Sequence, residues 1–429
     1  MQRARMVLPY LREQGWEGAV LAVEPAQVAA PVDPWLADGL PADVPVHRAA
    51  ALGLGWGRIP GLGTLTFRAL GALRRMGDEL LKTGRFDLVY FSTTQFGVHT
   101  LGPRWLRKFG VPFAMDYQDP WVNDYYRQHP AVVPPGGRLK YAVTDRLNRW
   151  MEPRVLRYCT GITSVSAAYP RQLLRRYPFL PSVWPVEILP FPGDGCDLRR
   201  VEQGGILQTM FTPGDGHRHW VYVGASGPMM AFAVRGIFSA LREHGNNQPG
   251  FLDDLRLHFV GTSYAAAGRG RNTVGPLAVD YGLAAVVREH PDRIPYSETL
   301  RCLLDADALI VPGSDDPGYT ASKIYPYLLS RKPLLAVFHE QSSVVSLMRA
   351  VGGGVCVPFR TGEPEESLAS RIRSEWLETA QWQRPVPLDR TAFAPHTAGE
   401  QAKVLCRFFE RCLASTRPAA RLRFQLSSF

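Results

Sequence analysis

One stretch of the sequence, residues 305–338, constrains the fold more than any other. It contains two short apolar runs, Ala308–Val311 and Leu334–Phe338, and each adjoins a proline. Apolar runs without alternation are typical of strands that are buried on both faces of a parallel sheet. The helix expected between the two runs is then a crossover connection, so the pattern predicts an α/β protein.

The loop before this helix favours an anionic ligand. Pro326 fits best in a first helical turn, so the helix is expected to begin no earlier than Ser322, which would cap it. Lys323 then lies at the end of the helix whose free amides attract anions, where its own charge opposes the helix dipole. Such a loop at the carboxyl end of a parallel strand is a common ligand site. We therefore expect Ser322 and Lys323 to hold phosphate.

This segment resembles the donor-binding segment of glycosyltransferases with two Rossmann-like domains, especially the family-4-like (group 1) enzymes. In that family one glutamate usually contacts the nucleotide ribose where this chain has Pro326, and a second is often found at the position of Gly318. If the chain transfers a sugar, Asp315 or Asp316 would have to replace them, and Tyr319 is a further candidate. The residues that match the family pattern are Ser322, Lys323, Ile324, Tyr327, Leu328, Lys332 and Pro333.

A second match lies in the first half of the chain. Residues 116–121, Asp-Tyr-Gln-Asp-Pro-Trp, resemble the Asp-(Phe/Leu)-Arg-Asp-Pro-Trp signature of many family-4-like transferases, with Gln118 in place of arginine. Because this loop ends an expected strand, we expect it to face the cleft. Asp119 and, after an earlier strand, His99 are candidate catalytic residues that would position or deprotonate an acceptor hydroxyl. An aspartate before proline also shapes turns, and an isolated histidine is often structural. A structural role therefore stays open for both residues.

The second half opens with a strand, Trp220–Gly224, which runs into a loop and a helix. This is how a nucleotide-binding domain begins, and it makes Gly224 and Arg235 donor-binding candidates. Asp305 and Asp307 form an Asp-x-Asp pair like the metal-binding pair of a different transferase fold. They lie at a helix-to-strand junction without a second carboxylate cluster, so we expect no metal.

The start of the chain departs from the usual order. A doubly wound domain normally opens with a central strand and a glycine-rich turn, whereas this sequence opens with a helical pattern at Met1–Gln14 and then a strand at Gly18–Val23. Either the recorded start lies downstream of the true one, or the sheet is genuinely shortened. We expect two Rossmann-like doubly wound domains that face each other across a cleft, as in the GT-B fold, with the first strand missing.

The expected domain bounds follow from these elements. An acceptor-side domain covers residues 1–190, and a linker covers 191–203. The nucleotide-sugar domain covers 204–395, a closing helix over 396–416 packs back on the first domain, and 417–429 form a basic tail.

The amino-acid composition limits the classes of partner that the chain is expected to bind. The chain has 429 residues, with 49 basic and 39 acidic side chains, and its net charge of +10 favours an anionic partner. Scattered cysteines indicate neither a zinc site nor a disulfide framework, which favours the cytoplasm. No nucleic-acid-binding pattern is present. The apolar loop at Leu52–Gly63, beside a basic helix at Thr64–Lys82, leaves contact with the inner face of a membrane open, although simple packing explains it as well.

Together, the resemblance implies a glycosyltransferase that moves a sugar from a nucleotide diphosphate sugar to a carbohydrate or glycolipid acceptor. It also implies retention of anomeric configuration, no metal or other cofactor, and a role in cell-surface polysaccharide or glycolipid synthesis. Two alternatives stay open. One is a non-catalytic nucleotide-sugar-binding or assembly protein, and the other is a nucleotide-sugar isomerase on the same fold.

Overall fold

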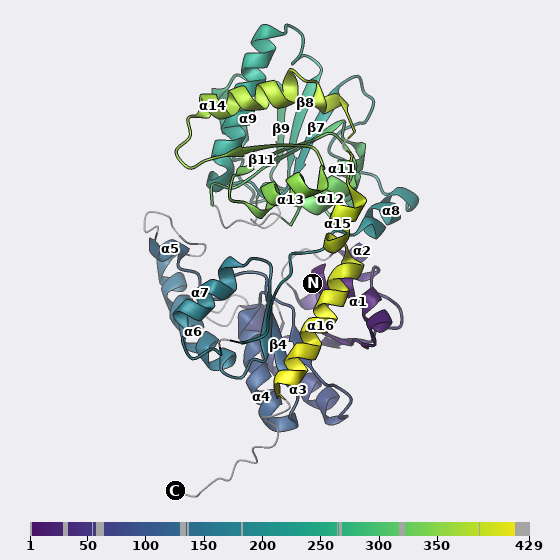
Figure 1. Cartoon of the computed structure of the whole chain (residues 1–429), viewed down its shortest axis with the longest axis vertical. Coiled ribbons are helices and arrows are strands. Elements are labelled where there is room, and N and C mark those ends of the chain that lie inside the picture. Colours follow the sequence, from purple (N-terminus) through teal and green to yellow (C-terminus); the bar gives the residue numbers. More distant parts are fainter. Residues whose placement is uncertain are drawn as a thin grey trace, which may run out of the picture. The chain divides into compact units, whose positions relative to one another are not determined.

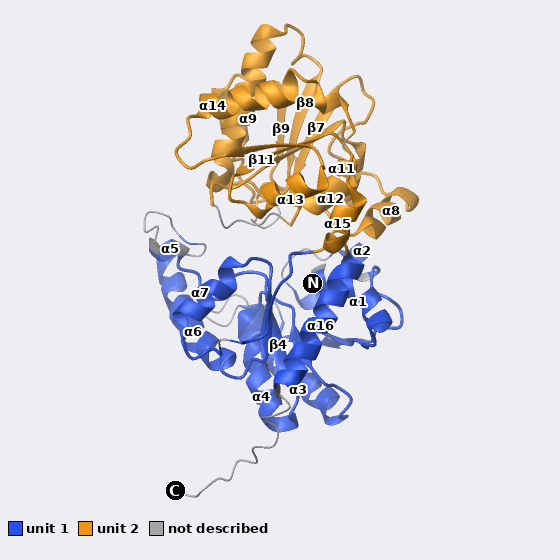
Figure 2. Cartoon of the chain, viewed as in Figure 1, with its two compact units in different colours: residues 1–191, 398–429 blue, residues 192–397 orange. Residues whose placement is uncertain are grey.

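The chain folds into two compact α/β units. Unit 1 comprises residues 1–191 and 398–429, and unit 2 comprises residues 192–397 (Figures 1 and 2). The computed structural model describes residues 2–28, 33–53, 55–56, 64–128, 134, 137–181, 183–263, 265, 268–316, 322–385 and 387–416.

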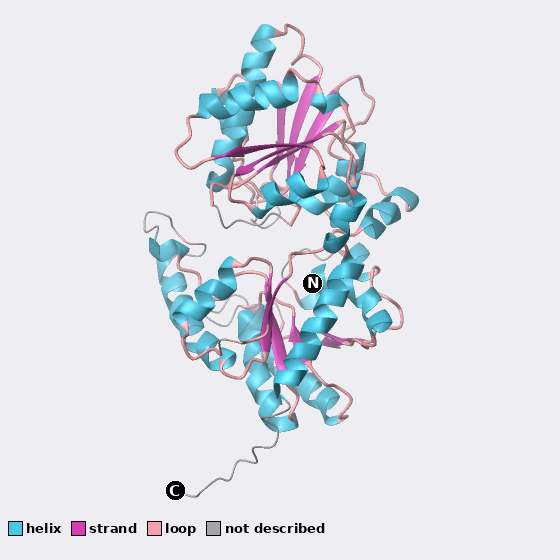
Figure 3. Ribbon diagram, viewed as in Figure 1, coloured by secondary structure: helices cyan, strands magenta, loops and turns pink. Residues whose placement is uncertain are grey.

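Unit 1 holds two parallel sheets, which appear with their surrounding helices in Figure 3. Its strands are β1 Val20–Val23, β2 Val46–Ala49, β3 Val89–Phe91, β4 Phe113–Tyr117, β5 Gly161–Ser164 and β6 Val186–Ile188. Its helices are α1 Gln2–Leu11, α2 Pro34–Ala37, α3 Leu65–Lys82, α4 Leu101–Phe109, α5 Tyr125–Gln128, α6 Arg138–Leu156, α7 Ala168–Arg176 and α16 Ala398–Thr416.

The strands of unit 1 divide into a pair and a set of four. β1 pairs only with β2, while β3, β4, β5 and β6 form one sheet in chain order. All of these pairings are parallel. The helical start and the strand after it are confirmed, and Gly15 ends the first helical segment in the left-handed conformation at φ 77°.

The last helix of the chain lies beside the first. Figure 1 shows α16, in yellow, alongside α1. Val7 and Leu11 of α1 share an apolar core with Leu405 and Phe408 of α16 and with Ala114 of β4. These two chain ends therefore cover one face of the four-stranded sheet together.

Unit 2 is built on one six-stranded parallel sheet with helices on both faces (Figure 3). Its strands are β7 Arg218–Val223, β8 Leu255–Val260, β9 Val287–His290, β10 Ala308–Pro312, β11 Leu334–His339 and β12 Val355–Phe359. Its helices are α8 Gly195–Gln203, α9 Ala231–Asn247, α10 Gly275–Asp280, α11 Tyr296–Asp305, α12 Ile324–Leu329, α13 Ser343–Val351, α14 Glu365–Ile372 and α15 Arg390–Phe393.

The two apolar runs in residues 305–338 are the neighbouring strands β10 and β11, with Val311 opposite Ala336. All residues of both strands are buried, as expected for a sheet covered on both faces. The crossover helix between them is α12. The expected α/β fold with parallel sheets is confirmed.

Two local expectations need revision. Most of the expected linker is helix α8, which packs on α11 and α12 within unit 2. β9 was not anticipated, because its sequence Val-Arg-Glu-His has a single apolar residue. The basic tail lies outside the described residues. Within the described part of the chain, no helix has the length and apolar character needed to cross a membrane.

Candidate functional site

The carboxyl ends of the strands in unit 2 meet at one edge of the sheet. The strand order is β12-β11-β10-β7-β8-β9, so the chain proceeds from β7 to β8 on one side and later reaches β10 on the other. Such a reversal leaves a crevice between β7 and β10 where α/β proteins bind ligands. The loop after β7 and the residues before α12 both lie there.

Lys323 is the charged residue at this reversal point. Its Nζ donates a hydrogen bond of 2.5 Å to the Tyr222 hydroxyl and lies 4.7 Å from the centre of the Tyr222 ring. Burial, and to a smaller degree the positive charge of Arg293, lowers the pKa of Lys323 to about 7. Among the described residues, no carboxylate forms an ion pair with Lys323. The site therefore holds a positive charge that an anionic ligand could neutralise.

Neighbouring groups fix the position of Lys323. The Tyr327 hydroxyl of α12 accepts a hydrogen bond from the Val223 amide over 2.6 Å and donates to the Val223 carbonyl over 3.1 Å. Gly224 follows with φ 155°, and a Cβ there would lie 2.7 Å from Lys323 Nζ. Only glycine therefore leaves room for the ammonium group over the backbone.

Further cations lie along the same edge, and the sequence did not single them out. Arg293 follows β9, and its charge acts on Lys323. A pocket of about 330 Å³ adjoins the loop after β7 and the loop after β8. Its lining carries hydroxyl groups and two arginines, from Ser226, Thr262, Ser263, Ala265, Arg269, Arg271 and Thr273. The arginines in the glycine-containing stretch 268–271 were a usable sequence signal.

The other donor-binding candidates have different positions. Asp315 and Asp316 are exposed in the loop after β10, where the Ser314 hydroxyl accepts a hydrogen bond from the Asp316 amide over 3.0 Å. Arg235 is not brought to Lys323, because its Nε pairs with Glu365 of α14 at 3.1 Å. Tyr319 and Gly318 lie outside the described residues.

The helix before β11 begins within the expected limit, but the expected cap was wrong. α12 begins at Ile324, and its N-cap residue is Lys323, which makes no capping hydrogen bond with its side chain. Ser322 is therefore not the cap. It lies in the turn before α12, where its carbonyl accepts from the Tyr325 amide over 3.4 Å. The short helix has little dipole to offer, so the Lys323 side chain supplies the positive charge.

In unit 1 a buried ion pair occupies the corresponding edge of the four-stranded sheet. Arg3 Nε lies 2.7 Å from Asp116 Oδ2, and both side chains are fully buried. Asp116 also accepts hydrogen bonds from Ser92, Gln118 and Thr163. Gln118, which replaces the arginine of the family signature, thus reaches the same carboxylate that Arg3 neutralises from α1.

The two candidate catalytic residues of unit 1 have opposite surroundings. Asp119 is exposed, and partial desolvation raises its pKa above the ordinary value. His99 is buried in an aromatic cluster with Phe91, Phe96 and Trp121. Its ring nitrogens have no hydrogen-bond partner among the described residues, and burial lowers its pKa to about 3. Asp119 is therefore accessible from solvent, whereas His99 is enclosed.

The Asp-x-Asp pair serves the fold. Asp305 forms an ion pair with Arg301, and the Asp307 carboxylate accepts a hydrogen bond from the His219 amide over 2.7 Å. In the described part of the chain, no group of three or more His, Cys, Asp or Glu side chains is arranged to hold a metal ion.

Comparison with known proteins agrees with these features. Residues 2–192 match the model of the glycosyl transferase 4-like domain. No curated protein matches the sequence.

Several solved structures share the fold. A glycosyltransferase from Rickettsia africae is 13% identical with a TM-score of 0.56, covering 96% of this chain and 94% of its own. A UDP-forming α,α-trehalose-phosphate synthase from Burkholderia xenovorans is 15% identical with a TM-score of 0.55, covering 96% of each chain. HepE from Anabaena, solved with UDP and glucose, is 13% identical with a TM-score of 0.50, covering 98% of this chain and 95% of its own.

Residues 2–192 thus match a glycosyl transferase 4-like domain, and the two Rossmann-like units share the GT-B fold of these solved glycosyltransferases.

Proposed function

We propose that the chain transfers a sugar from a nucleotide diphosphate sugar to a hydroxyl acceptor. The observation that carries the proposal is Lys323, a half-buried cation without a carboxylate partner among the described residues, at the strand-order reversal of unit 2. A diphosphate supplies the negative charge that this position lacks. Arg293 adds a second positive charge nearby.

The chemistry follows from these charges. As the bond between the anomeric carbon and the diphosphate breaks, negative charge grows on the leaving diphosphate, and Lys323 stabilises it. The anomeric carbon becomes oxocarbenium-like, as in other glycosyl transfers. Because the protein's own cations neutralise the diphosphate, we propose that transfer needs no metal ion. Retention of configuration belongs to the proposal on the strength of the family resemblance.

A uridine nucleotide fits the proposal best. HepE was solved with UDP and glucose, and the Burkholderia xenovorans synthase forms UDP. In this chain, the pocket beside Ser226 offers hydroxyl groups and the Arg269 and Arg271 cations for the rest of the donor. Its volume, about 330 Å³, lies in the range of small-molecule sites. Asp315 and Asp316, exposed in the loop after β10, are proposed to contact hydroxyl groups of the donor.

The acceptor is assigned to unit 1. Asp119 follows β4 and is exposed, and its raised pKa suits a group that takes a proton from a hydroxyl. His99 is left out of the catalytic proposal because of its enclosure. A carbohydrate or glycolipid acceptor of a cell-surface pathway is what the family resemblance suggests.

Thermal unfolding with a panel of nucleoside diphosphates and nucleotide sugars tests the donor site. A ligand at about 100 times its Kd stabilises the native state by about 2.7 kcal/mol. We expect a uridine nucleotide to raise the melting temperature of the wild type and to have no such effect on Lys323→Ala.

Lys332→Ala is the matched control. Lys332 is also a half-buried lysine with a lowered pKa, but it precedes β11 and so lies at the opposite edge of the sheet. It should keep the full nucleotide response. An equal loss in both variants, or no response in a folded wild type, would contradict the proposed donor site.

A non-catalytic nucleotide-sugar binder is the second candidate, and one observation favours it. Pro326 stands in α12 where the family usually has a ribose-binding glutamate. Slow hydrolysis of the bound donor, lost in Lys323→Ala, would support the enzyme. Tight binding without any release of nucleotide, with or without added acceptors, would support the binder.

A further inference from the structure

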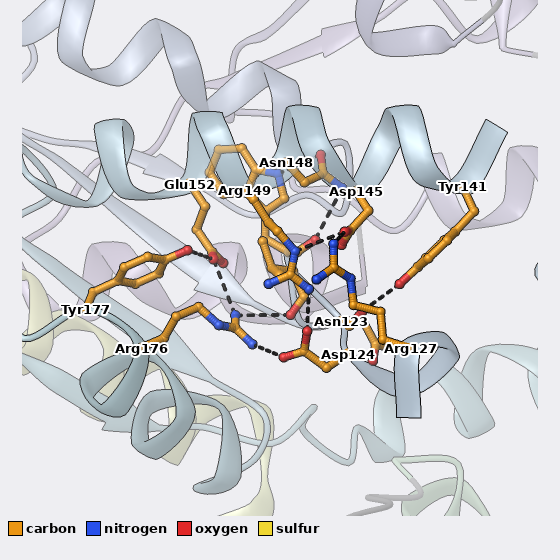
Figure 4. Close-up of polar contacts among 12 residues, drawn as sticks. Asn123, Asp124, Arg127, Tyr141, Asp145, Asn148, Arg149, Glu152, Arg176 and Tyr177 are labelled. Carbon is orange, nitrogen blue, oxygen red and sulfur yellow. Dashed lines mark hydrogen bonds and ion pairs between the residues drawn. The ribbon is translucent and has the colours of Figure 1, made fainter. Parts of the chain in front are cut away.

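Helix α6 of unit 1 has its polar face turned inward. Asp145 and Glu152 are buried, with exposed fractions of 5% and 0%. Asp145 Oδ2 lies 2.8 Å from Arg127 and 2.9 Å from Arg149, while Glu152 accepts a hydrogen bond from the Tyr177 hydroxyl over 2.6 Å. Figure 4 shows Asp145 and Glu152 pointing from α6 toward Arg127 of α5 and Arg176 of α7. The face that normally meets water is therefore used inside the unit.

The outer face of α6 carries large apolar side chains. Leu139, Val143, Leu147 and Trp150 are 81%, 63%, 50% and 55% exposed. Their spacing of four, four and three residues places them in one stripe along the helix. Single exposed apolar residues are ordinary, but a continuous row of them marks a surface that a partner covers.

Cations border this stripe, and the carboxylates of α6 are absent from it. Lys140 and Arg146 are exposed, and their helical positions fall on opposite sides of the stripe. Arg154 continues it, with its guanidinium 4.2 Å from the centre of the Trp150 ring. The helix has two carboxylates, Asp145 and Glu152, and both are buried. The exposed face of α6 thus carries apolar and positively charged side chains and no carboxylate.

The surface continues past the end of α6. Phe179 is 42% exposed, and the Arg157 guanidinium lies 5.2 Å from the centre of its ring. The same combination of an apolar ring and a basic group therefore recurs beyond the helix.

The charge on the outer face of α6 distinguishes between two possible partners, a second copy of the chain and a lipid bilayer. A second copy of the chain, packed through the same face, would bring Lys140 and Arg146 close to their own counterparts, and like charges would oppose the contact. An anionic bilayer attracts juxtamembrane lysine and arginine and accepts leucine and tryptophan at its interface. We propose that the outer face of α6 docks on an anionic lipid surface, with Leu147 and Trp150 inserted and Lys140 and Arg146 on the headgroups.

Membrane docking of α6 would also affect how the loop that holds Asp119 meets an acceptor. Asn148, on the inner face of α6, accepts a hydrogen bond over 3.1 Å from the Trp121 ring nitrogen, and Trp121 ends the loop that holds Asp119. A helix fixed on the membrane would then present that loop to acceptors in the lipid layer. This consequence rests on the proposed transferase function, whereas lipid binding by α6 does not.

Vesicle flotation of the full chain tests the proposal. We expect the wild type to float with vesicles that contain phosphatidylglycerol and to stay unbound with pure phosphatidylcholine. Leu147→Gln/Trp150→Gln should lower the apparent partition coefficient at least about tenfold, because each buried side chain contributes to insertion. Lys140→Gln/Arg146→Gln should lower it by about tenfold or more through lost attraction to anionic lipid.

Matched controls keep the test specific. Val279→Gln removes another exposed apolar residue, on α10 of unit 2, and Arg349→Gln/Arg384→Gln removes two exposed cations from the same unit. Both should bind vesicles like the wild type. The substituted α6 residues are exposed, and an unchanged circular dichroism spectrum would verify folding. Failure to float with anionic vesicles overturns the proposal. So does equal binding by the α6 variants, or a wild-type dimer that those variants dissociate.

Discussion

The Lys323 ammonium group rests on Tyr222, with Nζ 2.5 Å from the hydroxyl and 4.7 Å from the centre of the ring. A hydroxyl and an aromatic face are weak partners for a buried charge compared with a carboxylate. The site is therefore costly when empty and favourable when an anion enters.

Nucleotide-sugar binding should take up a proton at slightly alkaline pH. Burial lowers the pKa of Lys323 to about 7, so above pH 7 the free protein holds a mainly neutral amine. A bound diphosphate favours the charged form and raises this pKa. Affinity should then fall by up to about tenfold for each pH unit above about 7.

Titration calorimetry in buffers of different ionisation enthalpy measures that proton. A nucleotide sugar is the suitable ligand, because its diphosphate has no terminal phosphate that titrates near pH 7. Proton uptake should be present in the wild type and absent in Lys323→Ala. The same uptake in both proteins would place the titrating group elsewhere.

Lys323→Met should stabilise the free protein by about 2 kcal/mol near pH 7, the order of cost that a poorly compensated buried charge carries. The folded-state pKa lies below the ordinary value of 10.5, so the unfolded chain binds more protons between about pH 7 and 10.5. Wild-type stability therefore rises across this window, and the advantage of the variant should shrink. Urea unfolding at a series of pH values would detect an advantage that instead stays constant.

Gly224→Ala should weaken nucleotide binding by about tenfold or more, because the new Cβ would lie 2.7 Å from Lys323 Nζ and displace it. Gly227→Ala is the matched control in the same loop. Gly227 has an ordinary extended φ of −163°, and a Cβ there meets no atom within 4 Å. Equilibrium binding of a nucleotide sugar should separate the two variants, and equal affinities would argue against the placement of Lys323.

Arg3→Met should destabilise unit 1 by about 3–5 kcal/mol, because it leaves the Asp116 carboxylate buried without its cation. Asp116→Asn keeps the hydrogen-bonding shape without the charge. The double variant should cost clearly less than the sum of the single ones, as expected for a coupled pair. Additive losses in chemical unfolding would show that the two residues act independently.

Chelation should leave sugar transfer intact. Lys323 and Arg293 neutralise the leaving diphosphate in our proposal, so turnover with EDTA should remain within about twofold of the untreated rate. A chelator-sensitive rate restored by magnesium would contradict the metal-independent part of the proposal.

Asp119→Asn should lower the rate of sugar transfer by about 100-fold while nucleotide affinity stays the same, since a proton acceptor would be lost from unit 1.

The sequence by itself determined the fold class and the central segment. The apolar runs of β10 and β11 have no alternation because both faces of the sheet are covered. This pattern can be recognised from a short stretch of sequence. Lys323 and Gly224 could be named because each belongs to an element order that nucleotide-binding domains share. The short β9 escaped notice, since its burial comes from neighbours that the sequence does not display.

Tertiary structure alone decided which charges meet. Arg235 is paired with Glu365, which lies far along the chain, and Arg3 with Asp116, and no spacing rule links such positions. Tertiary structure also decided which face of α6 is buried. Asp145 and Glu152 lie inside the unit because Arg127, Arg149 and Tyr177 form ion pairs and hydrogen bonds with them there. A periodic pattern states that a helix has two faces, but only the partners packed against it determine which face is buried.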